Sequence, residues 1–154
     1  MKKIFFVLVI LTAVLLSCKS TPPAGSLDFT EVMGKNWRLT EYLVINRGSF
    51  LNRYSVSRTG TGESFTLRFD RELASGVGSP NRYTAPYTLG EGRNINIATV
   101  RSTLMAPLQE PEGLREHDYF VYLQSTYSWN LVGGNLELNS RTEDGREIRL
   151  VFSL

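Results

Sequence analysis

Short runs of alternating apolar and polar residues, separated by glycine turns, constrain the fold of this 154-residue chain more than any other feature. The clearest run covers residues 64–70, in which Phe65, Leu67 and Phe69 occupy every second position. Successive side chains of a strand point to opposite faces, so this period of two predicts a half-buried strand with these three residues inward.

Similar runs predict further strands over residues 36–45, 50–57, 82–89, 94–99, 127–131, 135–139 and 146–152. Glycine turns at 90–92, 132–134 and 143–145 join several of them into hairpins. In the first strand, the predicted inward residues are Trp37, Leu39, Leu43 and Ile45. Glu41 falls on the same side, so the strand twists or ends there, or Glu41 faces a wet interior.

In the last strand, Ile148, Leu150 and Phe152 are predicted inward, and Arg149 and Val151 outward. A short helical turn is expected within residues 27–33.

The segment 111–125 departs from the β pattern. His117 and Val121 fit a helical stripe, and Pro111 and Glu112 suit the start of a helix. Residues 119–123 can also be read as a strand. The expected fold is therefore mainly β: an antiparallel, curled sheet or partly open barrel with one helix near residues 111–125.

Residues 76–83 form a glycine-rich corner that ends in Asn81 and Tyr83. Gly, Pro and Asn are turn formers, so the favoured interpretation is a structural corner between strands. The alternative is a loop that cradles a ligand. Residues 58–63 are also glycine-rich, but they lack the Lys-Ser/Thr ending of a phosphate-binding loop, which indicates a plain turn.

The N-terminus reads as a secretory signal. Lys2 and Lys3 precede an apolar run over residues 4–16, and Leu15-Leu16-Ser17-Cys18 follows the pattern of a bacterial lipobox. We predict a lipoprotein signal peptide at 1–17, a lipidated tether at 18–31 and a β domain at 32–154, with Cys18 acylated. The alternative is a plain signal peptide cleaved elsewhere.

The charge and cysteine content limit the partners. The chain has 17 basic and 15 acidic residues; loss of Lys2 and Lys3 leaves 15 of each, so no nucleic-acid partner is predicted. The acyl chains on Cys18 are the expected membrane contact, and the expected location is the cell envelope. Lys19 is not the Asp that retains lipoproteins in the inner membrane, which favours the outer membrane in a cell with two membranes. As Cys18 is the only cysteine, the mature domain has no disulfide and no thiol nucleophile.

Residues 32–154 resemble the META domain, the HslJ-like family of bacterial envelope proteins. The motifs that carry the resemblance are Trp37-x-Leu39, Asn81-x-Tyr83, Thr103-Leu104-Met105-Ala106, Leu136-x-Leu138 and the terminal Phe152. The family often has cysteines where this chain has Pro80 and Pro107, so a disulfide sometimes expected there cannot form. The resemblance implies a barrel-like sheet with a packed helix, structural roles for these motif residues, and a part in envelope stress or antibiotic tolerance.

Catalytic chemistry is not indicated. His117 is the only histidine, no Gly-x-Ser-x-Gly motif accompanies it, and Glu112 and Glu116 add no second metal-binding histidine. Glu143-Asp144 reads as a turn rather than a glycosidase pair. We therefore expect a non-enzymatic binding or interaction protein without a cofactor or metal.

Two alternatives remain open. The domain could carry a small ligand inside the barrel, which unfilled interior volume would favour and close-packed Phe and Leu would oppose. It could instead be an enzyme, or an inhibitor of an envelope enzyme, that acts through an exposed loop. Tyrosines at a barrel mouth and the interleaved arginines could contact an anionic ligand or glycan; these arginines are Arg53, Arg58, Arg82, Arg93 and Arg101.

Overall fold

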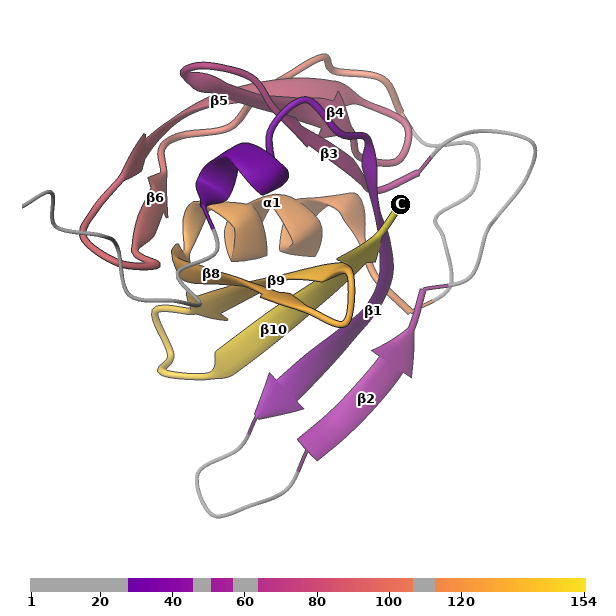
Figure 1. Cartoon of the computed structure of the whole chain (residues 1–154). Helices are drawn as coiled ribbons and strands as arrows, with labels where there is room; N and C mark the ends of the chain where they lie inside the picture. Colours follow the sequence, from indigo (N-terminus) through magenta and orange to yellow (C-terminus); the bar gives the residue numbers. More distant parts are fainter. Residues whose placement is uncertain (1–27, 46–50, 57–63, 107–112) are drawn as a thin grey trace, which may run out of the picture.

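The computed structural model describes residues 28–45, 51–56, 64–106 and 113–154 (Figure 1). The predicted signal peptide, Cys18, the turn at 58–63, and Pro107, Pro111 and Glu112 lie outside these ranges. The described elements are η1 (Phe29–Glu31), β1 (Trp37–Ile45), β2 (Leu51–Ser55), β3 (Thr66–Phe69), β4 (Leu73–Val77), β5 (Arg82–Leu89), β6 (Ile95–Ile97), β7 (Arg101–Ser102), α1 (Glu116–Gln124), β8 (Thr126–Val132), β9 (Asn135–Arg141) and β10 (Glu147–Ser153). Within the described ranges, no helix has the length and apolar character needed to cross a lipid bilayer.

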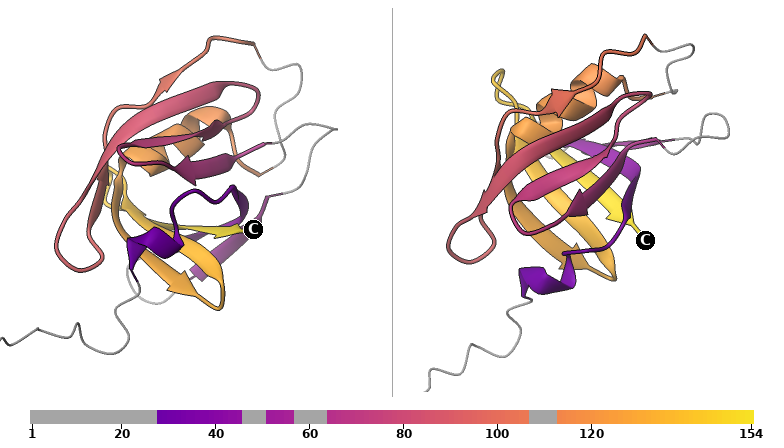
Figure 2. Two further views of the ribbon diagram at one scale, coloured as in Figure 1. Left: turned by 45° about the horizontal axis from the view of Figure 1, so that its top comes forward. Right: turned by 90° about the horizontal axis from the view of Figure 1, so that it is seen from above.

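The ten strands form one curled sheet. Their order is β6-β5-β4-β3-β1-β10-β9-β8, with β2 paired to β1 and β7 paired to β5. Every described pairing between strands is antiparallel. The two ends of the sheet approach each other, since Asn94 bridges to Ser128 and the Trp129 N–H donates to the Arg93 carbonyl at 3.0 Å. The sheet does not close into a barrel, which confirms the curled, partly open form (Figure 2).

Helix α1 lies between the β3–β5 and β8–β10 parts of the sheet (Figure 1). It buries Tyr119 and Leu123 completely and most of Tyr122. The helix begins five residues after the predicted start, because Gly113 has a φ of 92° and Arg115 is extended. The strand alternative for residues 119–123 is wrong: hydrogen bonds such as Tyr119 N–H to the Arg115 carbonyl, at 3.1 Å, are helical.

The predicted inward row of Phe65, Leu67 and Phe69 is confirmed, since all three are fully buried. Phe65 lies just before β3 with a φ of 51°, a conformation that non-glycine residues adopt rarely. Phe29 packs its ring against Phe69 at 5.1 Å and against Trp129 at 5.0 Å. The interior of the sheet is thus occupied by aromatic and leucine side chains.

A β-bulge in β1 resolves the position of Glu41. The register with β10 shifts between Leu39 and Glu41, so the strand exchanges its two faces there. Trp37 and Leu39 face the core before the bulge, and Tyr42 joins the same core after it. Glu41 is on the other face, where its carboxylate lies 3.3 Å from the Arg53 guanidinium.

The predicted single inward row is therefore wrong beyond the bulge. Leu43 is buried outside the main core cluster and Ile45 is only half-buried. Val151, expected outward, lies outside the main core cluster but is buried. Strand β10 lies between β1 and β9, so the Glu41 and Glu137 side chains on either side shield Val151.

Two short strands were not predicted. Strand β4 extends to Val77, so it includes the first two residues of the glycine-rich corner, and β7 follows β6 along the edge of β5. Gly76 permits β4 to approach β3 closely: a Cβ at this position would lie 2.0 Å from the Thr66 carbonyl oxygen. The sequence of β4, Leu-Ala-Ser-Gly-Val, consists mostly of small residues, so it has no clear alternation of apolar and polar positions.

Candidate functional site

The face of β3, β4 and β5 turned away from α1, at the top of Figure 1, carries a groove of about 370 Å³. Its polar side chains are those of Asn36, Arg38, Thr66, Arg68, Ser75, Arg82 and Thr84. No Asp or Glu is among the residues that line it. The groove therefore combines positive charge with hydroxyl groups.

The strand register brings these residues onto one face. Arg68 is opposite Ser75, Ser75 is opposite Thr84, and Thr84 is opposite Arg101 on β7. Cross-strand partners share a face of the sheet, so Arg101 adjoins the groove although it does not line it.

A second row lies two residues along the strands. Arg38 is opposite Thr66, and Val77 is opposite Arg82. The Val77 N–H donates to the Thr66 hydroxyl at 2.9 Å, which links β3 to the end of β4. The groove thus has arginines at both sides and small polar side chains between them.

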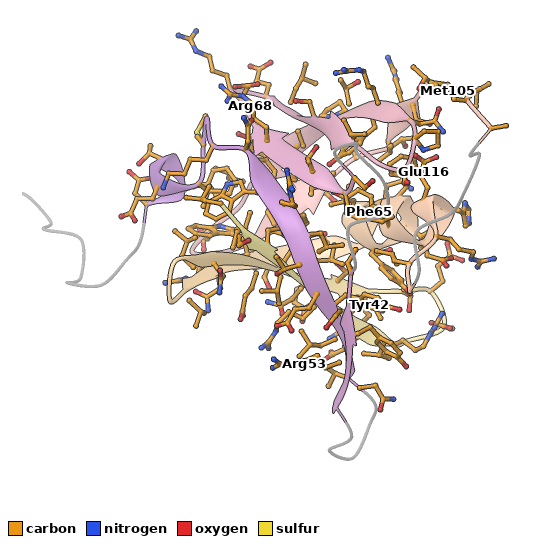
Figure 3. The ribbon with its side chains drawn as sticks, turned by 90° about the vertical axis from the view of Figure 1, so that its right-hand side faces the viewer. Tyr42, Arg53, Phe65, Arg68, Met105 and Glu116 are labelled. Atoms are coloured by element: carbon orange, nitrogen blue, oxygen red, sulfur yellow. The ribbon has the colours of Figure 1, made fainter. Side chains whose placement is uncertain are left out.

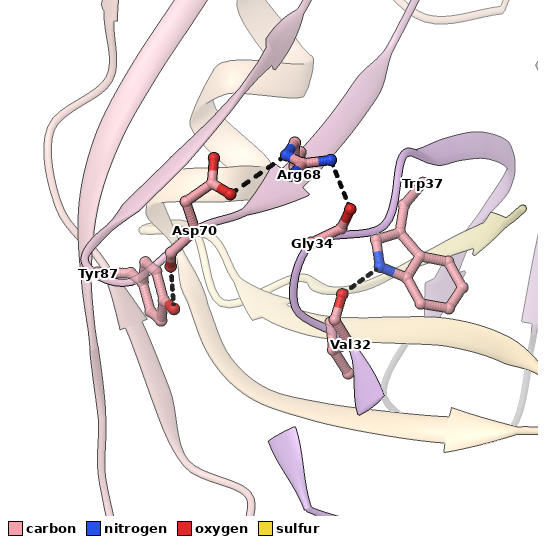
Figure 4. A network of polar contacts seen from close by, with 6 residues as sticks. All are labelled: Val32, Gly34, Trp37, Arg68, Asp70 and Tyr87. Atoms are coloured by element: carbon pink, nitrogen blue, oxygen red, sulfur yellow. Dashed lines mark hydrogen bonds and ion pairs between the residues drawn. The ribbon is translucent and has the colours of Figure 1, made fainter. Parts of the chain in front are cut away.

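Arg68 is fixed in place at one side of the groove. Its guanidinium donates to the Asp70 carboxylate at 3.2 Å and to the Gly34 carbonyl (Figure 4). Nearby, the Trp37 indole donates to the Val32 carbonyl at 2.9 Å.

At the other side, the structure gives Arg82 and Arg101 no ion pair within the described ranges. Asp70 offsets the charge of Arg68. The charges of Arg82 and Arg101, over β5 and β7, have no such carboxylate among the described residues.

Beside the groove, the glycine-rich corner is bound to the start of α1. One oxygen of the Glu116 carboxylate accepts the N–H groups of Ser79 at 2.5 Å and Asn81 at 2.7 Å. The other oxygen accepts from the Asn81 side-chain amide at 2.6 Å. Three donors from the corner thus converge on one carboxylate. Figure 3 labels Glu116 beside α1.

Asn81 also holds the segment after β7. Its Nδ2 donates to the Met105 carbonyl at 3.1 Å, and its Oδ1 accepts from the Thr103 hydroxyl at 2.8 Å and from the Met105 N–H at 2.7 Å. The buried Asn81 amide uses both of its donors and its acceptor on the protein itself. This arrangement favours the structural-corner interpretation over a ligand-cradling loop.

The other motif residues divide between core and surface. Trp37, Leu39 and Tyr83 are buried, whereas Thr103, Met105 and Ala106 are exposed. Leu104, between them, is 98% exposed. The Thr103–Ala106 segment therefore belongs to the surface, and only its backbone and the Thr103 hydroxyl are bound by Asn81.

Tyr83 and Tyr119 form a buried pair beneath the groove. Their hydroxyls lie 3.0 Å apart, and both contact the Thr66 carbonyl oxygen, at 2.8 Å and 3.1 Å respectively. Burial raises the pKa of Tyr83 and of Tyr119 well above that of a free phenol. Both tyrosines therefore stay neutral and act as structural donors.

His117 does not enter a catalytic arrangement with its described neighbours. It is exposed on α1 and borders a hollow of about 550 Å³ with Asp118, Tyr122, Asp144 and Arg146. No hydrogen bond joins it to a hydroxyl or carboxylate of the described residues. Among the same residues, no group of three His, Cys, Asp or Glu side chains could hold a metal ion.

The interleaved arginines do not form one cluster. Arg53 pairs with Glu41 on the β1–β2 arm, and Arg93 donates to Asn130 and lies 5.4 Å from the Trp129 ring centroid. Only Arg82 and Arg101 belong to the groove region, while Arg58 is outside the described residues. Sequence reasoning missed Arg38 and Arg68, although their alternation with core residues marked both as outward-facing.

Comparison with known proteins agrees with this architecture. The family model of the META domain matches residues 30–152. An NMR structure of a protein from Burkholderia xenovorans is similar in fold, with a TM-score of 0.56 and 21% identity over 80% of this chain and 85% of that chain. No curated protein matches the sequence. With the family model matched over nearly all of the described sheet and helix, the chain belongs to the META domain family.

Proposed function

We propose that this chain is a lipid-anchored protein of the bacterial cell envelope whose META domain is a non-enzymatic binding module for an anionic ligand. The observation that carries the binding role is the groove over β3–β5, which is lined by three arginines and by no carboxylate. Guanidinium groups bind phosphate and carboxylate through paired, charge-assisted hydrogen bonds.

The packed interior favours this surface over the inside of the sheet. The inward side chains of Phe65, Leu67, Phe69, Leu136 and Leu138 have no exposed surface. A carrier needs an internal cavity of a few hundred Å³ for a small ligand. Since close-packed Phe and Leu occupy the interior positions, the small-ligand carrier has no observation in its favour.

The anchor part of the proposal depends on Cys18 and on the apolar run before it. Two or more acyl chains hold a protein firmly at a bilayer. Within the predicted tether, the eight residues 19–26 reach at most about 25–30 Å when extended, so the domain stays near the membrane. The outer membrane is the proposed site in a cell with two membranes, with a role in envelope stress or antibiotic tolerance.

Acyl labelling tests the anchor. The Cys18→Ala variant is expected to lose palmitate labelling and to leave the membrane fraction. The matched control is Ser17→Ala, which keeps a small residue before the cysteine and should label normally. A Cys18→Ala variant that still incorporates palmitate would refute the lipid anchor.

Phosphate titration tests the groove. The full chain, purified in non-ionic detergent, is titrated with inorganic phosphate while the amide signals or the heat of binding are followed. Arg82→Gln is expected to weaken binding about tenfold, the factor that one charge-assisted contact of about 1.4 kcal/mol supplies. Arg53→Gln removes the same charge from the β1–β2 arm and should have no effect. Equal weakening by both variants, or no binding by the parent chain, would reject the groove as the site.

A further inference from the structure

The groove arginines fall into two pairs on opposite sides of a polar floor. Arg38 and Arg68 are on neighbouring strands β1 and β3, and Arg82 and Arg101 are on neighbouring strands β5 and β7. Strand β4 lies between them and contributes Ser75.

The spacing of the two pairs follows from the register. Arg68 and Arg101 belong to one lateral row, three strand spacings apart. At about 4.8 Å between neighbouring strands, their backbone positions are separated by about 14 Å. In the second row, Arg38 and Arg82 are also three strand spacings apart. This separation suits an extended ligand with charge at both ends, because each pair of arginines can then bind its own anionic group.

The pair over β5 and β7 is the one that most needs a partner. Arg101 is opposite Thr84, and the Thr103 N–H donates to the Arg82 carbonyl, so the two arginines are diagonal neighbours on adjacent strands. Long side chains at diagonal positions can reach each other, and like charges there repel. No described acidic side chain forms an ion pair with either arginine. An anion between them would relieve this repulsion.

The floor between the pairs suits a polar, uncharged spacer. Ser75 and Thr84 are cross-strand partners on the groove face and present hydroxyl groups, which both donate and accept hydrogen bonds. The Thr66 hydroxyl already accepts the Val77 N–H. A spacer rich in hydroxyls is complementary to this floor, and an apolar spacer is not.

We infer that the groove binds a two-ended anion, namely a short glycan that carries an anionic group such as phosphate at each end, with one end at Arg38 and Arg68 and the other at Arg82 and Arg101. This inference rests on the proposed binding function and adds the spacing and chemistry of the ligand. Free linear polyphosphate has the same spaced charges without the hydroxyl spacer.

The test compares two probes on the full chain in detergent: a disaccharide with one phosphate at each end, and the same disaccharide with a single phosphate. The bisphosphate is expected to bind about tenfold more tightly, or better, since it gains a second set of charge-assisted contacts. Arg101→Gln should remove this preference, because only the end at Arg38 and Arg68 then keeps its pair of guanidinium groups. Arg141→Gln, which removes an equal charge from β9, should retain the preference.

The outcomes separate the two proposals. If both probes bind equally and both depend on Arg82, the groove is an anion site but the two-ended ligand is rejected. If Arg101→Gln leaves the preference intact, the assignment of the second end is rejected. If neither probe nor inorganic phosphate binds, the proposed function fails as well. If long polyphosphate binds and the disaccharide bisphosphate does not, the ligand is still an anion with spaced charges, but the assignment of a glycan spacer is rejected.

Discussion

The side-chain amide of Asn81 lies 2.6 Å from the carboxylate of Glu116, although 35 positions separate the two residues in the chain. This contact joins the corner before β5 to the first residue of α1, and the same amide reaches Met105 beyond β7. Helix α1 and the edge of the sheet that bears Arg82 and Arg101 are thus held in one arrangement. The Asn-x-Tyr motif therefore connects the corner to the helix and to the segment after β7.

We expect Asn81→Asp to destabilise the domain by about 2–4 kcal/mol, because it places a second carboxylate against Glu116 and removes two buried donors. Chemical denaturation followed by fluorescence measures the change. The double variant Asn81→Asp with Glu116→Gln should recover part of the loss, since it restores one donor–acceptor pair. Equal stability of the Asn81→Asp variant and the parent would contradict the role given to this amide.

Gly76→Ala should cost about 1–3 kcal/mol or more, because the added Cβ would lie 2.0 Å from the Thr66 carbonyl oxygen and force β4 away from β3. The matched control is Gly92→Ala, where nothing lies within 4 Å but φ is +64°. This control should cost only about 1–2 kcal/mol of backbone strain. Thermal unfolding of both variants compares the cost of the steric contact at Gly76 with the cost of the backbone strain at Gly92. The expectation fails if Gly76→Ala is no more destabilising than the control.

Alkaline pH should unfold the protein through Tyr83 and Tyr119. Burial raises the pKa of both phenols, so the folded state retains protons that the unfolded state loses above pH about 10. Their contribution to stability is complete below that pH and falls above it, by about 1.4 kcal/mol per pH unit for each group.

The variant Tyr83→Phe isolates one of the two groups. Its free energy of unfolding should fall less steeply above pH about 10, by about 1.4 kcal/mol per pH unit. Urea unfolding at a series of pH values measures the two slopes. Identical slopes for the variant and the parent would show that Tyr83 does not titrate differently in the folded and unfolded states.

Local pattern was sufficient for much of the sheet. The alternation of Phe65, Leu67 and Phe69 correctly predicted a buried face, because successive side chains of a strand point to opposite faces of the sheet. The glycine turns near 90–92 and 132–134 correctly joined β5 to β6 and β8 to β9. The helix was predicted, but Gly113 and the extended Arg115 delayed its start.

The errors arose where a backbone irregularity replaced the regular period. The bulge after Leu39 exchanged the faces of β1, so Glu41 left the core side and Tyr42 entered it. The adjustment depends on β10, which lies 111 positions away at the contact between the Thr40 hydroxyl and the Val151 carbonyl. A window of local sequence contains no information about such a partner.

The sequence alone determined the β class, the positions of most turns and the inward residues of the regular strands, since these follow from short-range periodicity and turn chemistry. Only the tertiary structure decided which strands are neighbours, and hence that Arg38, Arg68 and Arg82 line one groove and that Arg101 adjoins it. The physical reason is that register across the sheet depends on hydrogen bonds between distant segments. Alternation specifies the face of a residue but not the residue beside it.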